Sequence, residues 1–283
     1  SLSVTGTGVA ITAPVATAAT AVGGAGFTAN WNAVSGATGY FLDVYTKTPG
    51  QVTETLAGWN CATNTAASQT ADVGNANNIS IQALSLQGST GTISYQSGPS
   101  GATGTPNPYS VSANGWDAGQ DTKYWQVDVN TTGATNITVS SLQGSSSTGP
   151  KDFKLQYKVG AGGTWTDVTG ATVALTTAVV AGDLTTWGAL NNVALPAAAN
   201  NQALVSLRWI MTSNTSVSNA TVAAGGTSRI SAIYIKGQVN GFINNYVQQN
   251  INVGNVTSYA VTGLSPNTTY YYVCLLYTSD AAD

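Results

Sequence analysis

The side chains best suited to chemistry gather in one loop near the middle of the chain, Trp116-Asp-Ala-Gly-Gln-Asp-Thr-Lys-Tyr124. Its two carboxylates, Asp117 and Asp121, have amide and backbone oxygens between them. Ca²⁺ takes about six to eight oxygen ligands, so the two aspartates are candidate ligands of a calcium ion. Asp and Gly in loops also form turns in which the side chain bonds its own backbone. The sequence leaves both interpretations open, and it points to no other cofactor.

Most of the usual combinations of catalytic residues are absent from the sequence. The sequence contains no His, which excludes Ser-His-Asp and Cys-His nucleophiles and the usual zinc sites. No glycine-rich stretch is followed by Lys-Ser or Lys-Thr at the spacing of a phosphate-binding loop. A glycosidase needs carboxylates on opposite sides of the scissile bond, whereas Glu54 is the only Glu and Asp117 and Asp121 share one short loop. The sequence therefore predicts a protein that is not an enzyme.

Aromatic residues outside the core would be needed to bind a sugar, because the C–H faces of sugars stack on exposed rings. Trp116, Tyr124 and Trp187 lie at a loop or on a polar face and are candidate ligand residues, although a Trp beside Gly often covers a core. Arg208 points away from the apolar face of its own strand. Its guanidinium is either a group that donates paired hydrogen bonds to a ligand or simply a solvated side chain. The other tryptophans of this region are expected in the core: Trp125, Trp165 and Trp209.

The composition fits an extracellular β-protein. Only 7% of the 283 residues are charged, 42% are hydrophobic, and the net charge is −3. No basic patch is present to follow a phosphate backbone, so nucleic-acid binding is not expected. No apolar run reaches the roughly 18 residues of a membrane helix, so membrane insertion is not expected either. The first residues lack a signal-peptide pattern, so a signal for secretion is expected upstream of Ser1.

Alternation of apolar and polar residues predicts strands through most of the chain. Such half-buried strands, separated by glycine-rich turns and without a helical repeat, favour an all-β fold with an antiparallel jelly-roll sandwich. Residues 49–237 are far too many for a structureless loop and are expected to fold as a domain of their own. The alternating segments are Ile79–Ala83, Trp125–Val129, Ile137–Val139, Phe153–Val159 and Val205–Met211.

Two segments at opposite ends of the chain resemble parts of one fibronectin type III domain. Gly26–Tyr45, with Trp31 between two alternating strands, resembles strands B and C, and Val256–Val273 resembles strands E and F. Neither half carries the motif of the other. The resemblance implies one sandwich, formed by residues 11–48 and 238–273, that lacks strand G and is split by the inserted domain. It also implies that Trp31 is central to the core and that the Tyr270 hydroxyl bonds backbone at the corner of the sandwich.

The two ends of the chain resemble other sequences. Residues 1–10 resemble the last strand of an upstream immunoglobulin-like module, and residues 274–283 resemble the translation of a transposase adapter from a sequencing library. An extracellular protein with two cysteines invites a disulfide, but Cys274 belongs to this suspect tail. Cys61 is therefore expected to be a lone thiol.

The inserted domain resembles galactose-binding-like and discoidin-like sandwiches through the hairpin 152–168, with its glycine turn and Trp165. Together with the Trp116 and Trp209 motifs, it is similar to jelly-roll modules nested in secreted bacterial surface proteins. The resemblance implies a secreted or cell-surface protein in which this region is a monomeric unit of a longer chain. Adhesion, or binding of a polysaccharide or cell-surface glycan, is the function that it favours.

Two other functions are compatible with the sequence. The chain could be a structural spacer, or an accessory region of a secreted glycan-processing enzyme whose catalytic domain lies elsewhere. An exposed aromatic ring beside Asp117, Asp121 or Arg208 would favour binding. Complete burial of Trp116 and Trp187 would favour the spacer.

Overall fold

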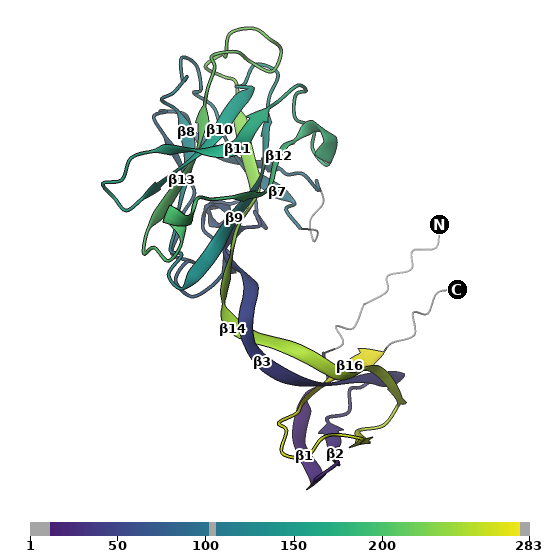
Figure 1. The fold of residues 1–283 in the computed structure, drawn as a ribbon. Helices are drawn as coiled ribbons and strands as arrows, with labels where there is room; N and C mark the ends of the chain where they lie inside the picture. Colours follow the sequence, from purple (N-terminus) through teal and green to yellow (C-terminus); the bar gives the residue numbers. More distant parts are fainter. Residues whose placement is uncertain (1–11, 102–105, 278–283) are drawn as a thin grey trace, which may run out of the picture. The chain divides into compact units, whose positions relative to one another are not determined.

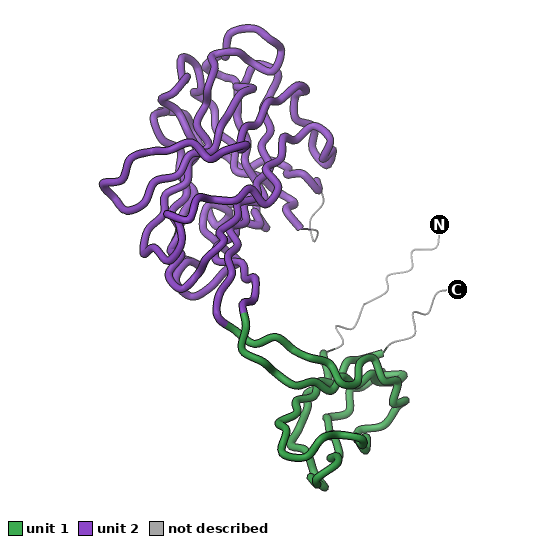
Figure 2. Tube along the Cα trace, viewed as in Figure 1, with its two compact units in different colours: residues 1–50, 241–283 green, residues 51–240 purple. Residues whose placement is uncertain are grey.

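The computed structural model describes residues 12–101 and 106–277 and is all-β. The chain divides into two compact units, residues 1–50 with 241–283 (unit 1) and residues 51–240 (unit 2), which Figure 2 colours separately. The sequence placed these boundaries at 48/49 and 237/238. Strands β3 (Gly39–Trp59) and β14 (Ser228–Gly254) pair with each other, and each continues from one unit into the other. The segment expected to end an upstream module, residues 1–10, lies outside the described residues.

Unit 1 contains a three-stranded sheet with the order β1 (Ala16–Gly23), β2 (Gly26–Trp31), β15 (Ser258–Thr262). It also contains the part of an eight-stranded sheet in which β14, β3 and β16 (Tyr271–Tyr277) are neighbours. Alternate residues of both sheets form one core, because period two places every second side chain on the same face. Trp31 is 3% exposed there, and its ring centroid lies 5.8 Å from that of Tyr40. The core of unit 1 consists of Ala29, Trp31, Tyr40, Leu42, Val44, Val261 and Cys274.

Tyr270 makes the backbone hydrogen bond that the sequence predicts. The Ser265 N–H donates to the Tyr270 hydroxyl at 3.1 Å, across the turn that contains Pro266. The bond joins the loop after β15 to the start of β16 and so fixes the path of the chain between the two sheets.

Replacing Tyr270 with Phe should destabilise unit 1 by about 1 kcal/mol, the net contribution of one such hydrogen bond. Hydrogen exchange of the amides in β2 and β15 should then quicken roughly fivefold. Tyr246→Phe, which removes a hydroxyl from an exposed ring of the same unit, is the matched control and should leave the exchange rates unchanged. Equal rates in both variants would show that the Tyr270 bond contributes nothing.

The last described strand runs further than the sequence predicts. β16 continues past Val273 to Tyr277, pairing Cys274 with Leu42 and Leu276 with Tyr40. The alternation persists, so Cys274 is buried in the core and Leu276 packs against it. The described strand thus extends four residues past the boundary expected at Val273. The adapter origin of residues 274–283 stays a prediction, and residues 278–283 lie outside the described residues.

Unit 2 contains the larger sandwich. Its first sheet is five-stranded and antiparallel (Figure 1), with the order β11 (Thr166–Ala174), β10 (Asp152–Val159), β13 (Val205–Met211), β8 (Tyr124–Val129), β5 (Ser85–Gln87). The second sheet contains the parts of β3 and β14 that lie in this unit, together with β4 (Val73–Gly74), β6 (Ile93–Ser97), β7 (Tyr109–Ala113), β9 (Ala134–Ser145) and β12 (Gly188–Ala194). Short 3-10 turns connect strands at η1 (Ala66–Gln69), η2 (Leu184–Thr186) and η3 (Ala197–Ala199).

Aromatic side chains fill the core of unit 2. The ring of Trp116 lies 5.6 Å from that of Trp125 and 5.7 Å from that of Phe153. A buried indole N–H needs an acceptor, and the core provides one for Trp125 and one for Trp209. Trp125 donates to the Ser228 hydroxyl at 3.1 Å, and Trp209 donates to the Ser141 hydroxyl at 2.9 Å. These hydrogen bonds account for the burial of Ser141 on β9 and Ser228 on β14.

The strand predicted at Ile79–Ala83 is wrong. Residues 76–81 form turns, and Ile79 and Ile81 are 36% and 62% exposed. The asparagines that precede them decide the conformation: Asn75 accepts hydrogen bonds through its side chain from the Asn77 N–H at 3.1 Å and the Asn78 amide at 3.0 Å. Local side-chain bonds of this kind compete with strand pairing. The strand of this region, β5, begins at Ser85.

Cys61 and Cys274 are both free and buried, so the disulfide considered from the sequence is absent. Burial raises the pKa of the Cys61 thiol to about 11, and it raises the pKa of Cys274 to about 11 as well. A thiolate is the nucleophile in cysteine chemistry, so both groups are unreactive in the folded chain.

We expect a thiol reagent such as DTNB at about pH 8 to label the native chain at least tenfold more slowly than the chain in urea, since a higher pKa leaves less thiolate. Two thiols should react once the protein unfolds. Rapid reaction of one thiol in the native protein would contradict the burial of that cysteine.

Candidate functional site

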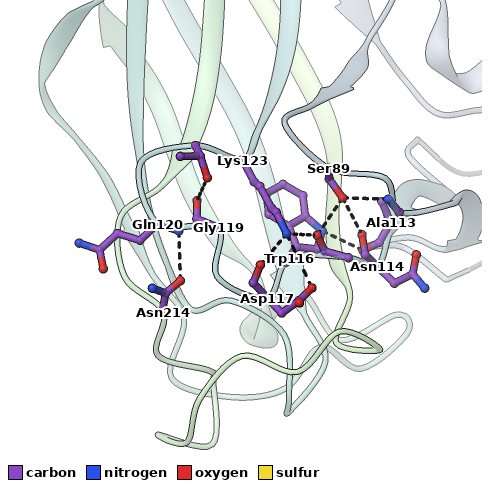
Figure 3. Close-up of polar contacts among 12 residues, drawn as sticks. Ser89, Ala113, Asn114, Trp116, Asp117, Gly119, Gln120, Lys123 and Asn214 are labelled. Atoms are coloured by element: carbon purple, nitrogen blue, oxygen red, sulfur yellow. Dashed lines mark hydrogen bonds and ion pairs between the residues drawn. The ribbon is translucent and has the colours of Figure 1, made fainter.

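The loop that the sequence proposes as a calcium site is held together by a lysine instead. The Lys123 ammonium donates to the carbonyl oxygens of Gly115 at 2.7 Å and Asp117 at 2.5 Å, and it lies 3.7 Å from an Asp117 carboxylate oxygen (Figure 3). An internal cation therefore occupies the oxygens that a calcium ion would need. Asp121 is exposed, and its N–H donates to the Met211 carbonyl at 2.8 Å. In the described part of the chain, no group of three His, Cys, Asp or Glu is placed to hold a metal ion.

Trp116 is not a ligand residue. Its exposed fraction is 0%, and its indole N–H donates to the Ala113 carbonyl at 2.9 Å (Figure 3). The ring packs inward against that of Trp125. Trp116, which follows Gly115, is therefore a core residue. This is the alternative that the sequence analysis left open for a Trp beside Gly.

Trp187 is also mostly covered, with 7% of its surface exposed. It lies against an apolar groove of about 380 Å³ that also has Leu142, Leu184 and Tyr234 in its lining. Its indole nitrogen is buried and has no hydrogen-bond partner among the described residues. A ring this deeply covered offers little surface for stacking a sugar, so Trp187 is removed from the ligand candidates.

Polar side chains instead cover the outer face of the five-stranded sheet. On β8, Trp125, Val127 and Val129 are buried, whereas Tyr124 and Gln126 alternate with them on the opposite face. The same period governs β10 and β13, so their outward residues lie beside those of β8. The register aligns one row across the sheet: Asp167, Gln156, Arg208, Gln126 and Ser85.

Arg208 is the centre of this face. Its guanidinium carbon lies 4.7 Å from the ring centroid of Tyr124 and 4.2 Å from that of Trp165. The two rings meet edge to face, with centroids 6.1 Å apart. Arg208 also donates through Nε to the Gln156 side-chain oxygen at 2.8 Å. Stacking on two rings and one hydrogen bond hold the guanidinium in a fixed position.

Trp165 corrects a prediction, because the sequence placed it in the core. It precedes β11 in the turn of the β10–β11 hairpin and is half-buried on the outer face. The Lys158 ammonium lies 5.0 Å from its ring centroid. The ring is therefore held by cations of two neighbouring strands, while part of it faces solvent. We call Tyr124, Gln156, Trp165, Asp167 and Arg208 the outer-face site.

Asp167 completes the outer-face site. It accepts a hydrogen bond from the Gln156 amide at 2.5 Å and forms an ion pair with Lys154 at 3.0 Å. The bond from Gln156, followed by that from Lys154, lowers the pKa of the Asp167 carboxyl. A lowered pKa in the folded state means that this stabilisation is complete at neutral pH and is lost as the pH falls below the ordinary Asp range. Burial lowers the pKa of Arg208, but a guanidinium stays charged in proteins.

The structure brings together two of the predicted ligand residues, Tyr124 and Arg208, and separates them from Trp116 and Trp187. Asp121 contributes only its charge, which acts on Arg208 through space. Sequence reasoning missed Gln156, Trp165 and Asp167, together with the lysines beside them. A signal was present, because the polar residues of β10 alternate with buried Phe153 and Leu155.

Comparisons with known proteins assign no family. No family model matches the chain, and no curated protein matches it. A solved structure, the enzymatically active domain of tailspike protein 4 from bacteriophage CBA120, aligns at 10% identity and a TM-score of 0.31. The match covers 61% of this chain and 22% of that one. A likeness at this level identifies neither a fold family nor a function. Among the described residues, no helix is long and apolar enough to cross a membrane.

Proposed function

We propose that this chain is a non-catalytic binding module of a secreted or cell-surface protein, and that its outer-face site binds a carbohydrate. The observation that carries the proposal is the cluster that Arg208 forms with the half-exposed rings of Tyr124 and Trp165. Rings of this kind contact the C–H faces of sugars, and neighbouring amides and charged groups bond the hydroxyls. Gln156 and Asp167 supply those groups from the adjacent strands.

The charge state of the face supports binding rather than hydrolysis. A general acid for glycoside cleavage needs a raised pKa, whereas the pKa of Asp167 is lowered by its hydrogen bonds. The Asp167 carboxylate is also occupied by Lys154. To bind a sugar, the Asp167 carboxylate needs only to accept a hydrogen bond from a hydroxyl, and no proton is transferred.

The architecture fits a modular extracellular protein. We propose that unit 1 is a fibronectin type III sandwich without strand G and that unit 2 is a jelly-roll sandwich inserted into it. The strand orders β1-β2-β15 and β14-β3-β16, and the Tyr270 hydrogen bond, support the first assignment. The antiparallel five-stranded sheet and its β10–β11 hairpin support the second. In such proteins each module is a monomeric unit of a longer chain.

Affinity electrophoresis of the full chain in gels that contain neutral or acidic polysaccharides tests the binding proposal. We expect at least one glycan to retard the protein. Trp165→Ala should weaken that binding at least about fivefold, since one well-placed ring contributes more than about 1 kcal/mol. Tyr246→Ala, at a 46% exposed ring of unit 1, is the control for removing an exposed aromatic and should bind like the original chain.

The burial of Trp116 and Trp187 is the observation that favours a structural spacer instead. A folded chain that no glycan retards would support the spacer and overturn the binding proposal. Retardation that Trp165→Ala and Tyr246→Ala reduce equally would move binding away from the outer-face site.

A further inference from the structure

We propose that the outer-face site selects acidic glycans and that Arg208 binds the carboxylate of a uronic acid. The inference rests on the proposed function and names the ligand class for the same site. A planar guanidinium matches a planar carboxylate through two parallel hydrogen bonds, a geometry that a lysine ammonium does not offer.

Among the described residues, no carboxylate forms an ion pair with the Arg208 guanidinium. In the part of the chain that the structure describes, the ion pairs are Lys123 with Asp117 and Lys154 with Asp167. The contacts of Arg208 are the rings of Tyr124 and Trp165 and the Gln156 side-chain oxygen. None of these partners is an anion, so a carboxylate from a ligand would add the first contact of opposite charge.

The nearby carboxylates are already engaged with other side chains. Asp167 is held by Lys154 and Gln156, and Asp128 accepts a hydrogen bond from the Gln126 amide at 3.2 Å. Asp121 acts on Arg208 only through space. Asp167 also acts on Arg208 through space, but the ion pairs of the described residues include none with Arg208, so its guanidinium is available to a ligand carboxylate.

The guanidinium is also pre-organised. Two rings and the bond from Nε fix its plane before a ligand arrives, which removes much of the side-chain entropy otherwise lost on binding. Lys158 places a second cation 5.0 Å from the ring centroid of Trp165, on the same side of the sheet. In a uronic acid the carboxylate is attached directly to the sugar ring. A sugar that contacts Trp165 therefore carries its carboxylate within reach of these cations.

The test compares a uronate with its own neutral form. Binding of the full chain is measured by affinity electrophoresis with polygalacturonate, fully methyl-esterified polygalacturonate, alginate, neutral galactan and dextran sulfate. We expect the uronates to bind at least about tenfold more tightly than the methyl ester, because esterification removes the charge and changes little else. Arg208→Gln should lose that preference. Arg208→Lys should lose most of the preference, because lysine keeps the positive charge but lacks the two parallel N–H donors of the guanidinium.

Lys236→Gln is the matched control, because it removes one positive charge from β14 in the other sheet of unit 2. It should leave the uronate preference intact. Thermal unfolding of both Arg208 variants is measured alongside, and Arg208→Lys keeps the inference testable if Arg208→Gln fails to fold.

The outcomes separate the inference from the proposed function. Equal binding of the ester and the acid, or a uronate preference that survives in Arg208→Gln and Arg208→Lys, would overturn the inference and leave carbohydrate binding standing. Tightest binding to dextran sulfate, reduced equally by Arg208→Gln and Lys236→Gln, would show attraction to charge alone and overturn it too. Absence of binding to every glycan would overturn the proposed function itself.

Discussion

Replacing Trp116 with alanine is expected to destabilise unit 2 by about 3 to 5 kcal/mol, the range for emptying a fully buried Trp site. The side chain is 0% exposed and packs between the rings of Trp125 and Phe153, so its loss leaves a large cavity. The Ala113 carbonyl also loses its hydrogen bond from the indole. Since a domain is stable by only about 5 to 15 kcal/mol, a large fraction of the stability of unit 2 would be lost.

Urea unfolding followed by far-ultraviolet circular dichroism measures this effect without depending on the fluorescence of the deleted indole. Trp165→Ala is the matched control, because it deletes the same side chain from a half-exposed position. It should cost less than about half as much as Trp116→Ala, since cost follows burial. A Trp116→Ala change below about 1 kcal/mol would contradict the placement of this ring in the core.

Replacing Gln143 with methionine is expected to stabilise unit 2 by about 1 to 3 kcal/mol, the penalty for a buried polar group without partners. Gln143 is 0% exposed on β9, where it lies opposite Ile230 and Gly188 on the neighbouring strands. Neither its amide nitrogen nor its amide oxygen has a hydrogen-bond partner among the described residues. Methionine has a similar length and no polar group to desolvate.

The melting temperature and the urea midpoint should both rise for Gln143→Met. Gln120→Met, the same substitution at an exposed residue, is the control and should change stability by less than about 0.5 kcal/mol. A loss of stability in Gln143→Met would show that a buried water satisfies the amide, since removing such a water is costly.

The two stability variants test the core of unit 2, whereas the binding variants test its outer face. Trp116 and Gln143 lie inside the sandwich, whereas Trp165 and Arg208 lie on its outer face. A chain that keeps its stability in Trp165→Ala but loses glycan retardation would therefore identify a surface role. The spacer interpretation predicts the opposite, with no surface residue affecting any binding measurement.

The period-two alternation by itself predicted the all-β class and most of the strands that carry the outer-face site. Phe153–Val159, Trp125–Val129 and Val205–Met211 are strands in the structure, with the apolar residues of β8 and β13 inside and Arg208 outside. The alternation failed at Ile79–Ala83, because Asn75 forms local side-chain bonds that favour a turn. A pattern of apolar residues does not report such bonds.

Only the tertiary structure decided which side chains meet. Trp116 and Trp165 both stand near glycines in loops, yet one is buried and the other half-exposed, because burial depends on which strands cover a loop. Arg208 and Tyr124 lie 84 residues apart in sequence and meet because antiparallel pairing sets β13 against β8 in one register. The sequence determines the face on which a strand residue lies; strand order and register determine its neighbours on that face.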